Sequence, residues 1–418
     1  MKRFTVRLLT IVALFGALLV SLQLFSPPLW TGSLTSHAQS SWEDKFWVFD
    51  AHMHPISSVY RRGGTIGEPN ADPRFTLSLA EQGGLGAAFF NTSIDEFLEV
   101  NHLAVKDALM QIDRFYSEIA KYPDQVGVAT NLTQVQSLRR QGKIAGILAI
   151  EGALALESDL GVLRMFHRLG LREMNLVHLL GNNIGDVGFS ELNDDKGYGL
   201  TDYGRQLVAE MNRLGILIDL SHTGEQTIMD VMAVSTQPVS TTHSAARALG
   251  SGWSDEMIRT LAKMNGVICV PAMPQINTPR SESRKRPPRG SRLVGLEPLL
   301  YKGDPTKIYE FMEERSNASE SRRAETTGER RRNLLPMSKF IDHIDYIVRL
   351  VGVDHVGFST DFGGFPTNIQ EMENAGEYQN IAQALLQRGY SREDVAKIMG
   401  ENVLRLFDEV VRTARSSS

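Results

Sequence analysis

The chain has 418 residues, of which 42% are hydrophobic and 22% are charged, and its formal net charge is −5. This composition is typical of a globular protein and allows one large α/β domain with a sizeable core. Without a basic excess, a nucleic-acid partner is not expected. Cys269 is the only cysteine. The chain therefore has no internal disulfide, and any metal site must use histidines and carboxylates.

The N-terminal segment is typical of an export signal. An apolar run covers residues 8–25, and the positive charges that precede it are Lys2, Arg3 and Arg7. The small residues in Ser-His-Ala at 36–38 suit cleavage after residue 38. The alternative is an uncleaved membrane anchor, since 18 apolar residues are near the lower limit for a span. We expect an exported protein with a signal peptide or anchor at 1–38 and a linker at 39–45.

After the linker, short apolar runs alternate with longer amphipathic segments. The runs predict eight β-strands, at residues 46–51, 84–90, 144–150, 173–177, 216–220, 239–242, 267–271 and 356–360. Helical spacing of apolar residues predicts helices at 100–122, 203–214, 224–234, 254–264, 336–351, 381–388 and 391–414.

This alternation predicts an α/β fold with a parallel sheet, and eight such strands close a (β/α)8 TIM-type barrel. We expect the barrel over residues 46–414. The alternative is an open doubly wound sheet, which usually carries a Gly-rich loop after its first strand. That loop is missing from the sequence, which favours the barrel.

Residues 274–333 interrupt the alternation. The segment is rich in Arg, Ser, Glu and Pro and follows the seventh predicted strand. We predict a polar insertion, which is either a solvated surface segment or a lid-like segment over the mouth of the barrel.

Metal-binding residue types stand at the carboxyl ends of six predicted strands. They are His52 and His54 on the first strand, then Glu151, His178, His222, His243 and Asp361. In a parallel barrel these ends meet at one face, where barrel enzymes carry their active sites. A single histidine at a strand end is usually structural, but six such ends together predict a catalytic centre.

Histidine and carboxylate ligands favour zinc, with iron, cobalt or manganese as alternatives. Four histidines and one glutamate are more than a single open zinc site needs. They suit two divalent ions, bridged by Glu151, that hold a hydroxide at neutral pH. We assign His102, His167 and His343 to helix surfaces and His355 to the opposite end of the barrel.

From about residue 46 to residue 407 the chain resembles the membrane (renal) dipeptidase family, binuclear zinc metallopeptidases of the amidohydrolase superfamily. The segments that carry the resemblance are FDAHMHP, AIEGALAL, GILIDLSH, PVSTTHSAARAL and VGFSTDFGG, in this order. The resemblance implies a (β/α)8 barrel, two Zn²⁺ ions, hydrolysis of dipeptides and frequently a homodimer.

The same resemblance implies a role for each site residue. The metal ligands would be His52, His54, Glu151, His222 and His243, with Glu151 bridging the ions. His178 would contact the substrate carbonyl and stabilise its developing charge. The bridging hydroxide would attack the peptide carbonyl, and Asp361 would pass a proton to the leaving amine.

Three positions depart from the family pattern. His54 replaces an aspartate, Gly363 replaces a second aspartate, and Ser254 stands where an arginine usually grips the substrate carboxylate. Because a carboxylate clamp distinguishes a dipeptide from other amides, the sequence leaves two alternatives open. One is a metal-dependent amidohydrolase that acts on N-acyl amino acids, cyclic amides or lactones. The other is a degenerate, non-catalytic binding protein.

Overall fold

The structure is a computed structural model, and it describes residues 45–69, 72–94, 98, 102–178, 182–188, 197–277, 334–365 and 368–416. All of them belong to the second of the chain's two units, Met1–Asp44 and Lys45–Ser418. The predicted signal segment at 1–38 and the predicted insertion beyond residue 277 lie outside the described residues. Among the helices that are described, none is long and apolar enough to cross a membrane.

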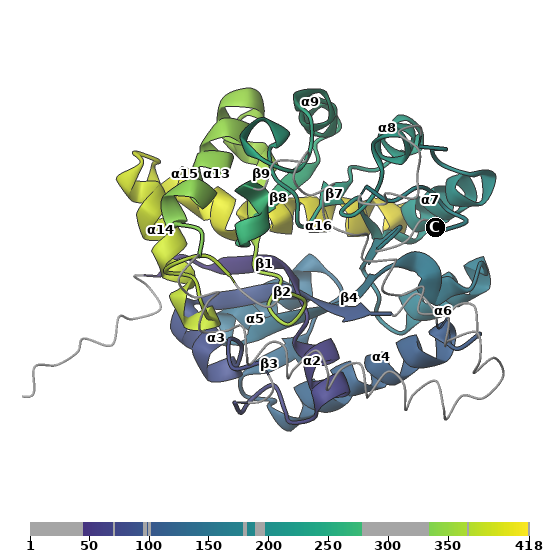
Figure 1. The fold of residues 1–418 in the computed structure, drawn as a ribbon. Coiled ribbons are helices and arrows are strands. Elements are labelled where there is room, and N and C mark those ends of the chain that lie inside the picture. Colours follow the sequence, from purple (N-terminus) through teal and green to yellow (C-terminus); the bar gives the residue numbers. More distant parts are fainter. Residues whose placement is uncertain are drawn as a thin grey trace, which may run out of the picture. The chain divides into compact units, whose positions relative to one another are not determined.

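Parallel strands form a single sheet in the described part of the chain (Figure 1). They are β1 (Val48–Met53), β2 (Leu85–Ser93), β3 (Val126–Val128), β4 (Ile144–Glu151), β5 (Glu173–Asn175), β6 (Leu217–Asp219), β7 (Ser240–Thr241), β8 (Val267–Pro271) and β9 (Val356–Ser359). Eight of them pair in the order β1-β2-β4-β5-β6-β7-β8-β9.

Backbone hydrogen bonds just beyond β9 close the sheet into a barrel. The Asp361 N–H donates to the carbonyl of His52 at 2.8 Å, and the His54 N–H donates to the carbonyl of Phe362 at 2.7 Å. These bonds join the end of the chain's last strand to the end of its first. The predicted barrel is therefore confirmed, and the open doubly wound sheet is excluded.

Strand β3 was not predicted, because its three residues are too short an apolar run to stand out. It pairs with the start of β4, where Val126 lies opposite Ile144. Strand β5 pairs with the end of β4 on the same edge, where Glu173 lies opposite Ala149. Thus β3 pairs with the first residues of β4, and β5 pairs with the last residues of β4 on the same edge.

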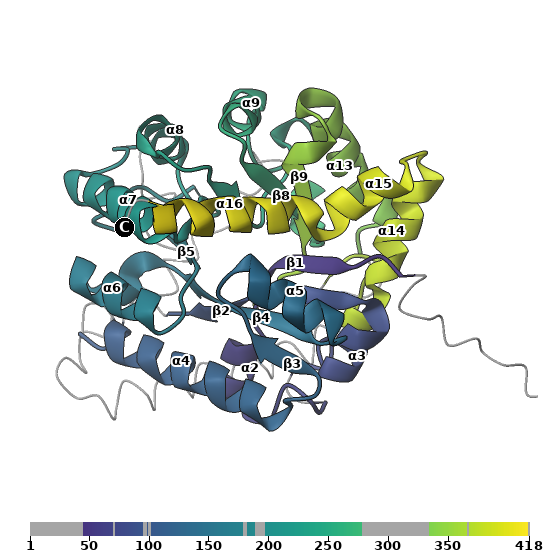
Figure 2. The same cartoon turned by 180° about the vertical axis from the view of Figure 1, so that it is seen from behind.

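Helices surround the strands (Figures 1 and 2). They are α2 (Pro55–Arg62), α3 (Leu77–Gly83), α4 (Ala104–Lys121), α5 (Leu132–Arg140), α6 (Leu160–Arg168), α7 (Asp202–Leu214), α8 (Glu225–Val234), α9 (Asp255–Lys263), α13 (Met337–Val351), α14 (Tyr378–Gln387), α15 (Arg392–Ala396) and α16 (Asn402–Ser416). Many begin at side-chain N-caps, for example Thr201 before α7 and Ser391 before α15. Helices α2, α3, α5 and α6 were not predicted.

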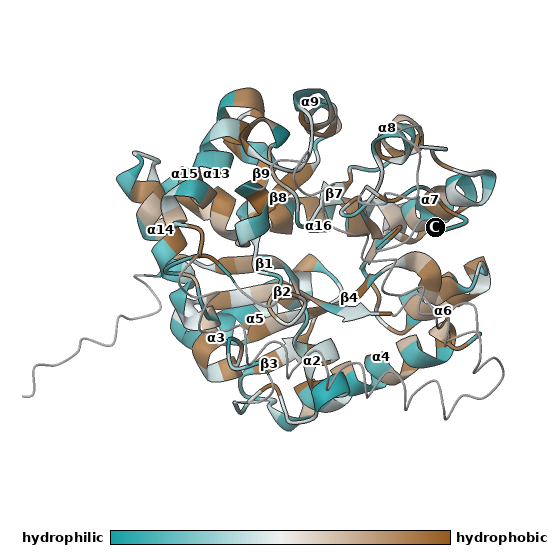
Figure 3. Ribbon diagram, viewed as in Figure 1, coloured by the Kyte–Doolittle hydropathy of each residue, from teal (hydrophilic) through white to brown (hydrophobic). Residues whose placement is uncertain are grey.

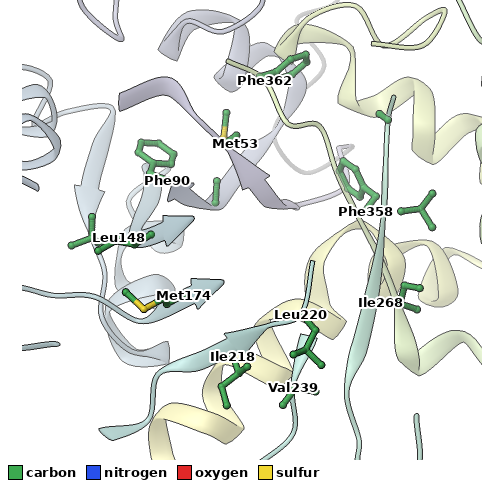
Figure 4. Close-up of a cluster of buried hydrophobic side chains, with 14 of the residues drawn as sticks. Met53, Phe90, Leu148, Met174, Ile218, Leu220, Val239, Ile268, Phe358 and Phe362 are labelled. Atoms are coloured by element: carbon green, nitrogen blue, oxygen red, sulfur yellow. The ribbon is translucent and has the colours of Figure 1, made fainter. Parts of the chain in front are cut away.

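In several strands, alternate residues enter two different hydrophobic clusters. On β4, Leu148 and Ile150 join the cluster between the strands and the outer helices, whereas Ile147 and Ala149 join a smaller cluster with α16. Figure 4 shows the first cluster, to which successive strands each contribute a side chain. Figure 3 shows hydrophilic residues on the outer helices, among them α4 and α9. Burial on both faces explains the continuous apolar runs that predicted the strands.

Helix α16 packs across the end of the barrel opposite to the predicted site (Figure 2). Phe407 contacts Phe89 of β2 edge-to-face at 6.1 Å, and Asn402 donates to the carbonyls of Val353 and Val356 at the start of β9. The predicted helix at 391–414 is interrupted at Gly400, which packs against Phe49. The strand ends that carry the metal-binding residues therefore lie at the end of the barrel that α16 does not cover.

Candidate metal centre

The structure brings all seven predicted site residues together at the carboxyl ends of the strands. Glu151 ends β4, and the others lie at or just beyond the ends of β1, β5, β6, β7 and β9. The centre is deeply buried: the side chain of His52 is 0% exposed, and those of His178 and Asp361 are 14% and 12% exposed. The convergence that the strand ends predicted is confirmed.

The Glu151 carboxylate stands at the middle of this cluster. The histidine Nε2 atoms nearest to its Oε1 belong to His222 (3.1 Å), His52 (3.4 Å) and His243 (3.8 Å). Those nearest to Oε2 belong to His178 (3.4 Å) and His54 (3.5 Å). Both oxygens of Glu151 thus face imidazole nitrogens, as a bridging carboxylate requires.

The separations between these atoms fit divalent metal ions. Two ligand atoms on one tetrahedral zinc ion lie about 3.3 Å apart, because each is about 2.0 Å from the metal. His54 Nε2 lies 3.3 Å from Asp361 Oδ1. Three sets of three side chains have ligand atoms within 4.8 Å of one another: His52, His54 and Asp361; His52, Glu151 and His243; and Glu151, His178 and His222. The donors are nitrogen and oxygen, which suits zinc.

Thr242 and Asp219 fix the protonation of two of the histidines. The Thr242 hydroxyl donates its only proton to Asp219 Oδ2 at 2.5 Å, so its oxygen can only accept further hydrogen bonds. It lies 3.0 Å from His52 Nδ1 and 3.1 Å from His243 Nδ1. This acceptor favours the tautomer with the proton on Nδ1 in both histidines, which leaves the Nε2 lone pairs free to bind a metal.

Burial and mutual charge set the ionisation of the metal-free centre. Burial opposes ionisation of Glu151, but the charges of His178 and His54 and hydrogen bonds from His222 and His52 hold its pKa well below the usual value. Burial and the neighbouring charges of His52 and His222 hold the pKa of His243 well below its usual value. An ionised glutamate and a neutral histidine are the forms that bind divalent ions.

Two of the candidate site residues have a left-handed backbone, His222 with φ 65° and Asp361 with φ 54°. This conformation costs a non-glycine residue about 1–3 kcal/mol, so the surrounding structure must hold it in place. At His222 it is supported by the β5–α7 loop, because the Gly188 N–H donates to the His222 carbonyl at 2.6 Å. The side chains of His222 and Asp361 therefore point in directions that differ from those at the end of a regular β-strand.

The histidines outside the centre only partly follow the prediction. His355 lies at the start of β9, at the opposite end of the barrel as expected, and His102 is highly exposed but precedes helix α4. His167 lies partly buried on α6. The assignment of His343 to a helix surface is wrong: it is 0% exposed and accepts a hydrogen bond from the Ala246 N–H at 3.2 Å. It therefore supports the loop that follows His243.

Ser254, which stands where the family has an arginine, has a structural role. Its hydroxyl caps α9 by accepting a hydrogen bond from the Met257 N–H. Arg247 forms an ion pair with Glu225, with nitrogen–oxygen distances of 3.1 and 2.9 Å, and donates to the carbonyl of Gly252. This pair joins the loop after His243 to the start of α8, just after His222.

The sequence reasoning missed the residues that orient the histidines. Asp50 accepts from the His52 N–H at 3.1 Å, and Asp219 accepts from the Ser221 N–H at 3.0 Å. The side-chain amide of Asn91 also lies 3.0 Å from His52 Nδ1, and toward an Nδ1 that carries the proton it would have to turn its oxygen. The signal that could have found the aspartates is their spacing, because each is a charged residue inside an apolar strand, two or three positions before a predicted ligand.

The comparisons with known proteins agree with this geometry. The family model of the membrane dipeptidases (peptidase family M19) matches residues 40–418. Dipeptidase tcpJ of Claviceps purpurea is 31% identical over 349 residues, which cover 81% of this chain and 70% of that protein. Dipeptidase aclJ of Aspergillus oryzae is 28% identical over 345 residues, 80% of this chain and 69% of that one.

Solved structures give the same result for the fold. The probable dipeptidase PvdM from Pseudomonas aeruginosa superimposes with a TM-score of 0.71 at 25% identity, over 89% of this chain and 97% of that one. A metallopeptidase from Rhodobacter sphaeroides, solved with a phosphinate mimic of the dipeptide L-Ala-D-Ala, has a TM-score of 0.64 at 23% identity, over 88% and 100%. Together with the barrel and its cluster of histidines around Glu151, these matches show that the chain belongs to the membrane dipeptidase family.

Proposed function

We propose that this protein hydrolyses dipeptides with two divalent metal ions, Zn²⁺ being the ion that its donors suit best. The observation that carries the proposal is the position of Glu151, whose two carboxylate oxygens each face histidine nitrogens at 3.1–3.8 Å. The remaining ligands would be His52, His54, His222 and His243. Bound ions would supply a hydroxide at neutral pH and polarise the substrate carbonyl.

Two residues at the rim of the centre, His178 and Asp361, would contact the substrate. His178 and Asp361 are more exposed than His52, so a substrate in the barrel mouth can reach them. His178 would donate a hydrogen bond to the carbonyl oxygen as negative charge develops there. Asp361 would accept a proton and return it to the leaving amine.

The test is a substrate panel of dipeptides, N-acyl amino acids and lactones, measured before and after removal of metal by a chelator. We expect dipeptide hydrolysis that is lost on chelation and regained on addition of Zn²⁺. If the metal-loaded protein hydrolyses no dipeptide, the proposal is wrong. Preferred turnover of N-acyl amino acids or lactones would instead support the second candidate, an amidohydrolase of another substrate class. The helix-capping role of Ser254 favours that candidate, because it leaves this position without a clamp.

We also propose that the protein is exported, through the signal-like segment at residues 1–38. Mass spectrometry of the mature protein tests this: a chain that starts after residue 38 supports cleavage, and an intact N-terminus in the membrane fraction supports an anchor. Size-exclusion chromatography with light scattering tests the homodimer that the family resemblance implies.

A further inference from the structure

A short antiparallel bridge between residues 187–188 and 222–223 holds the backbone of His222. The Gly188 N–H donates to the His222 carbonyl at 2.6 Å, and Val187 pairs with Thr223. His222 has a left-handed backbone, with φ 65°, which it keeps only where its surroundings hold it. A Cβ atom at Gly188 would lie 3.0 Å from the Thr223 carbonyl oxygen, so glycine suits this close approach. The bridge therefore helps to fix the direction of the His222 side chain.

Asp186, two residues before Gly188, fastens the bridge to helix α8. Its backbone N–H donates to the Thr227 hydroxyl at 3.1 Å, and that hydroxyl donates to the Asp186 carboxylate. The Asp186 carbonyl accepts from the N–H of Gly224, the N-cap residue of α8, at 2.8 Å. Asp186 thus bonds to α8 through both its backbone and its side chain, close to where the chain leaves His222.

Two glycines make room for the Asp186 carboxylate. A Cβ atom at Gly224 or at Gly197 would overlap Asp186 Oδ2. The other oxygen, Oδ1, also accepts from the Gly199 N–H at 3.1 Å, and the residue is only 4% exposed. The positive end of the α8 dipole favours a negative charge at this position. The fold therefore encloses the carboxylate beside the start of α8.

The other end of the β5–α7 loop is fastened near His178. Asn182 Nδ2 donates to the Leu176 carbonyl at 2.9 Å, and Asn182 Oδ1 accepts from the Ile184 N–H at 2.9 Å. The ring centroids of His178 and His222 lie 4.8 Å apart. The loop is thus held at one end beside the residue that would contact the substrate and at the other end beside a metal ligand.

We propose that Asp186 is a positioning residue for His222 and for the metal ion that His222 binds. By fastening residues 187–188 to α8, Asp186 holds the His222 backbone, and the His222 imidazole then presents its Nε2 at 3.1 Å from Glu151 Oε1. Asp186 acts through His222 and is not itself a ligand. The inference rests on the proposed function, because it acts on one of the proposed metal ligands.

The test compares the metal affinities of wild type, Asp186→Ala and the matched control Asp230→Ala. Asp230 also lies on the α8 side of this region, and its carboxylate likewise accepts from a backbone N–H, that of Leu200 at 2.9 Å, but its other oxygen bonds to Gln226. Chelator competition should show that Asp186→Ala binds one of its two ions about 10–100-fold more weakly and the other as wild type does. The control should bind both ions as wild type does.

Two further variants separate positioning from folding. Asp186→Asn keeps an oxygen that can accept from Thr227 and Gly199, so it should recover most of the lost affinity. Thr227→Val keeps the shape of the side chain but removes the hydroxyl, so it should weaken the same ion, and it decides the question if Asp186→Ala does not fold. Urea unfolding of the metal-free proteins measures the stability of each variant.

Equal affinity for both ions in Asp186→Ala and wild type would overturn the inference. Equal weakening of both ions would also overturn it, because a general loss of stability has that effect. In both cases the proposed function stands, provided that wild type binds two ions and hydrolyses dipeptides. If wild type itself binds no metal, the proposed function fails and this inference fails with it.

Discussion

His343 on the outer helix α13 accepts a hydrogen bond from the backbone of Ala246, three residues after His243 in the metal centre. An imidazole nitrogen can accept this bond only while it carries no proton. Burial lowers the pKa of His343 to about 4, against the weaker opposing charge of Asp342. The support of the His243 loop therefore depends on a neutral histidine.

The low pKa of His343 predicts that the folded protein loses stability in acid. In the unfolded chain His343 takes up a proton below about pH 6.5, whereas in the folded chain it does so only near pH 4. The unfolded state therefore binds more protons between these values, and stability falls as the pH falls through that window. At pH 5 the expected loss is about 2 kcal/mol relative to pH 7.5.

The measurement is urea unfolding of metal-free wild type and His343→Gln at pH 7.5 and pH 5. The variant keeps a polar side chain but cannot titrate, so its loss of stability on acidification should be smaller by about 2 kcal/mol. The two proteins share every other titrating group, and an equal loss in both would contradict the role of His343.

A second prediction concerns the Thr242 hydroxyl, which favours the Nδ1–H tautomers of His52 and His243. Thr242→Val keeps the shape of this buried side chain but removes the acceptor. We expect metal affinity to fall by about 10–100-fold, as for other residues that orient metal-bound histidines, while Thr242→Ser stays close to wild type. Chelator competition measures both, and unchanged affinity in the valine variant would show that the hydroxyl is not needed.

Glu173 on β5 gives a third prediction. Both of its carboxylate oxygens are buried and make no hydrogen bond within the described part of the chain. Burial together with the charges of Asp219 and Glu151 raises the pKa of Glu173 well above the usual value. The folded protein keeps the proton at pH values where the unfolded chain has lost it, so stability is lost as the pH rises above about 4.5.

Removing this carboxyl should therefore stabilise the protein at alkaline pH. We expect Glu173→Gln to have a higher unfolding midpoint than wild type at pH 8 and a similar one at pH 4.5, both measured without metal. A variant that is less stable than wild type at pH 8 would indicate that Glu173 is ionised and paired in the folded state.

Glu151 gives the fourth prediction. A glutamine at this position cannot bridge two cations, so we expect Glu151→Gln to keep its fold and lose most of one ion. Its activity should fall by more than about 100-fold, the upper end of the effect of residues that only orient metal ligands. Glu256→Gln, on the exposed side of α9, is the matched control. Full activity in Glu151→Gln would rule out the bridging role.

The sequence predicted the centre well because its ligands follow a simple rule. Each strand ends where its apolar run ends, so the metal-binding residue just after the run could be placed at one face of the barrel from topology alone. Glu151 and His243 are examples. Their convergence needed no knowledge of side-chain packing, only eight strands in a parallel barrel.

What the sequence did not predict depends on contacts between segments that are distant along the chain. The hydrogen bond from Thr242 to Asp219 crosses from one strand to the next, and nothing in a single apolar run indicates it. His343 was assigned to a helix surface because histidine is a polar residue. It lies three residues from Phe340 and four from Ile347, on the buried face of α13. The position of α16 across the barrel is likewise set by tertiary packing.

The most direct test of the account is the metal content of the active protein. Elemental analysis of wild type that hydrolyses a dipeptide should find two divalent ions per chain, and activity should rise in proportion to metal as the metal-free protein is reloaded. Full dipeptide turnover by protein that contains no divalent metal would contradict the central claim.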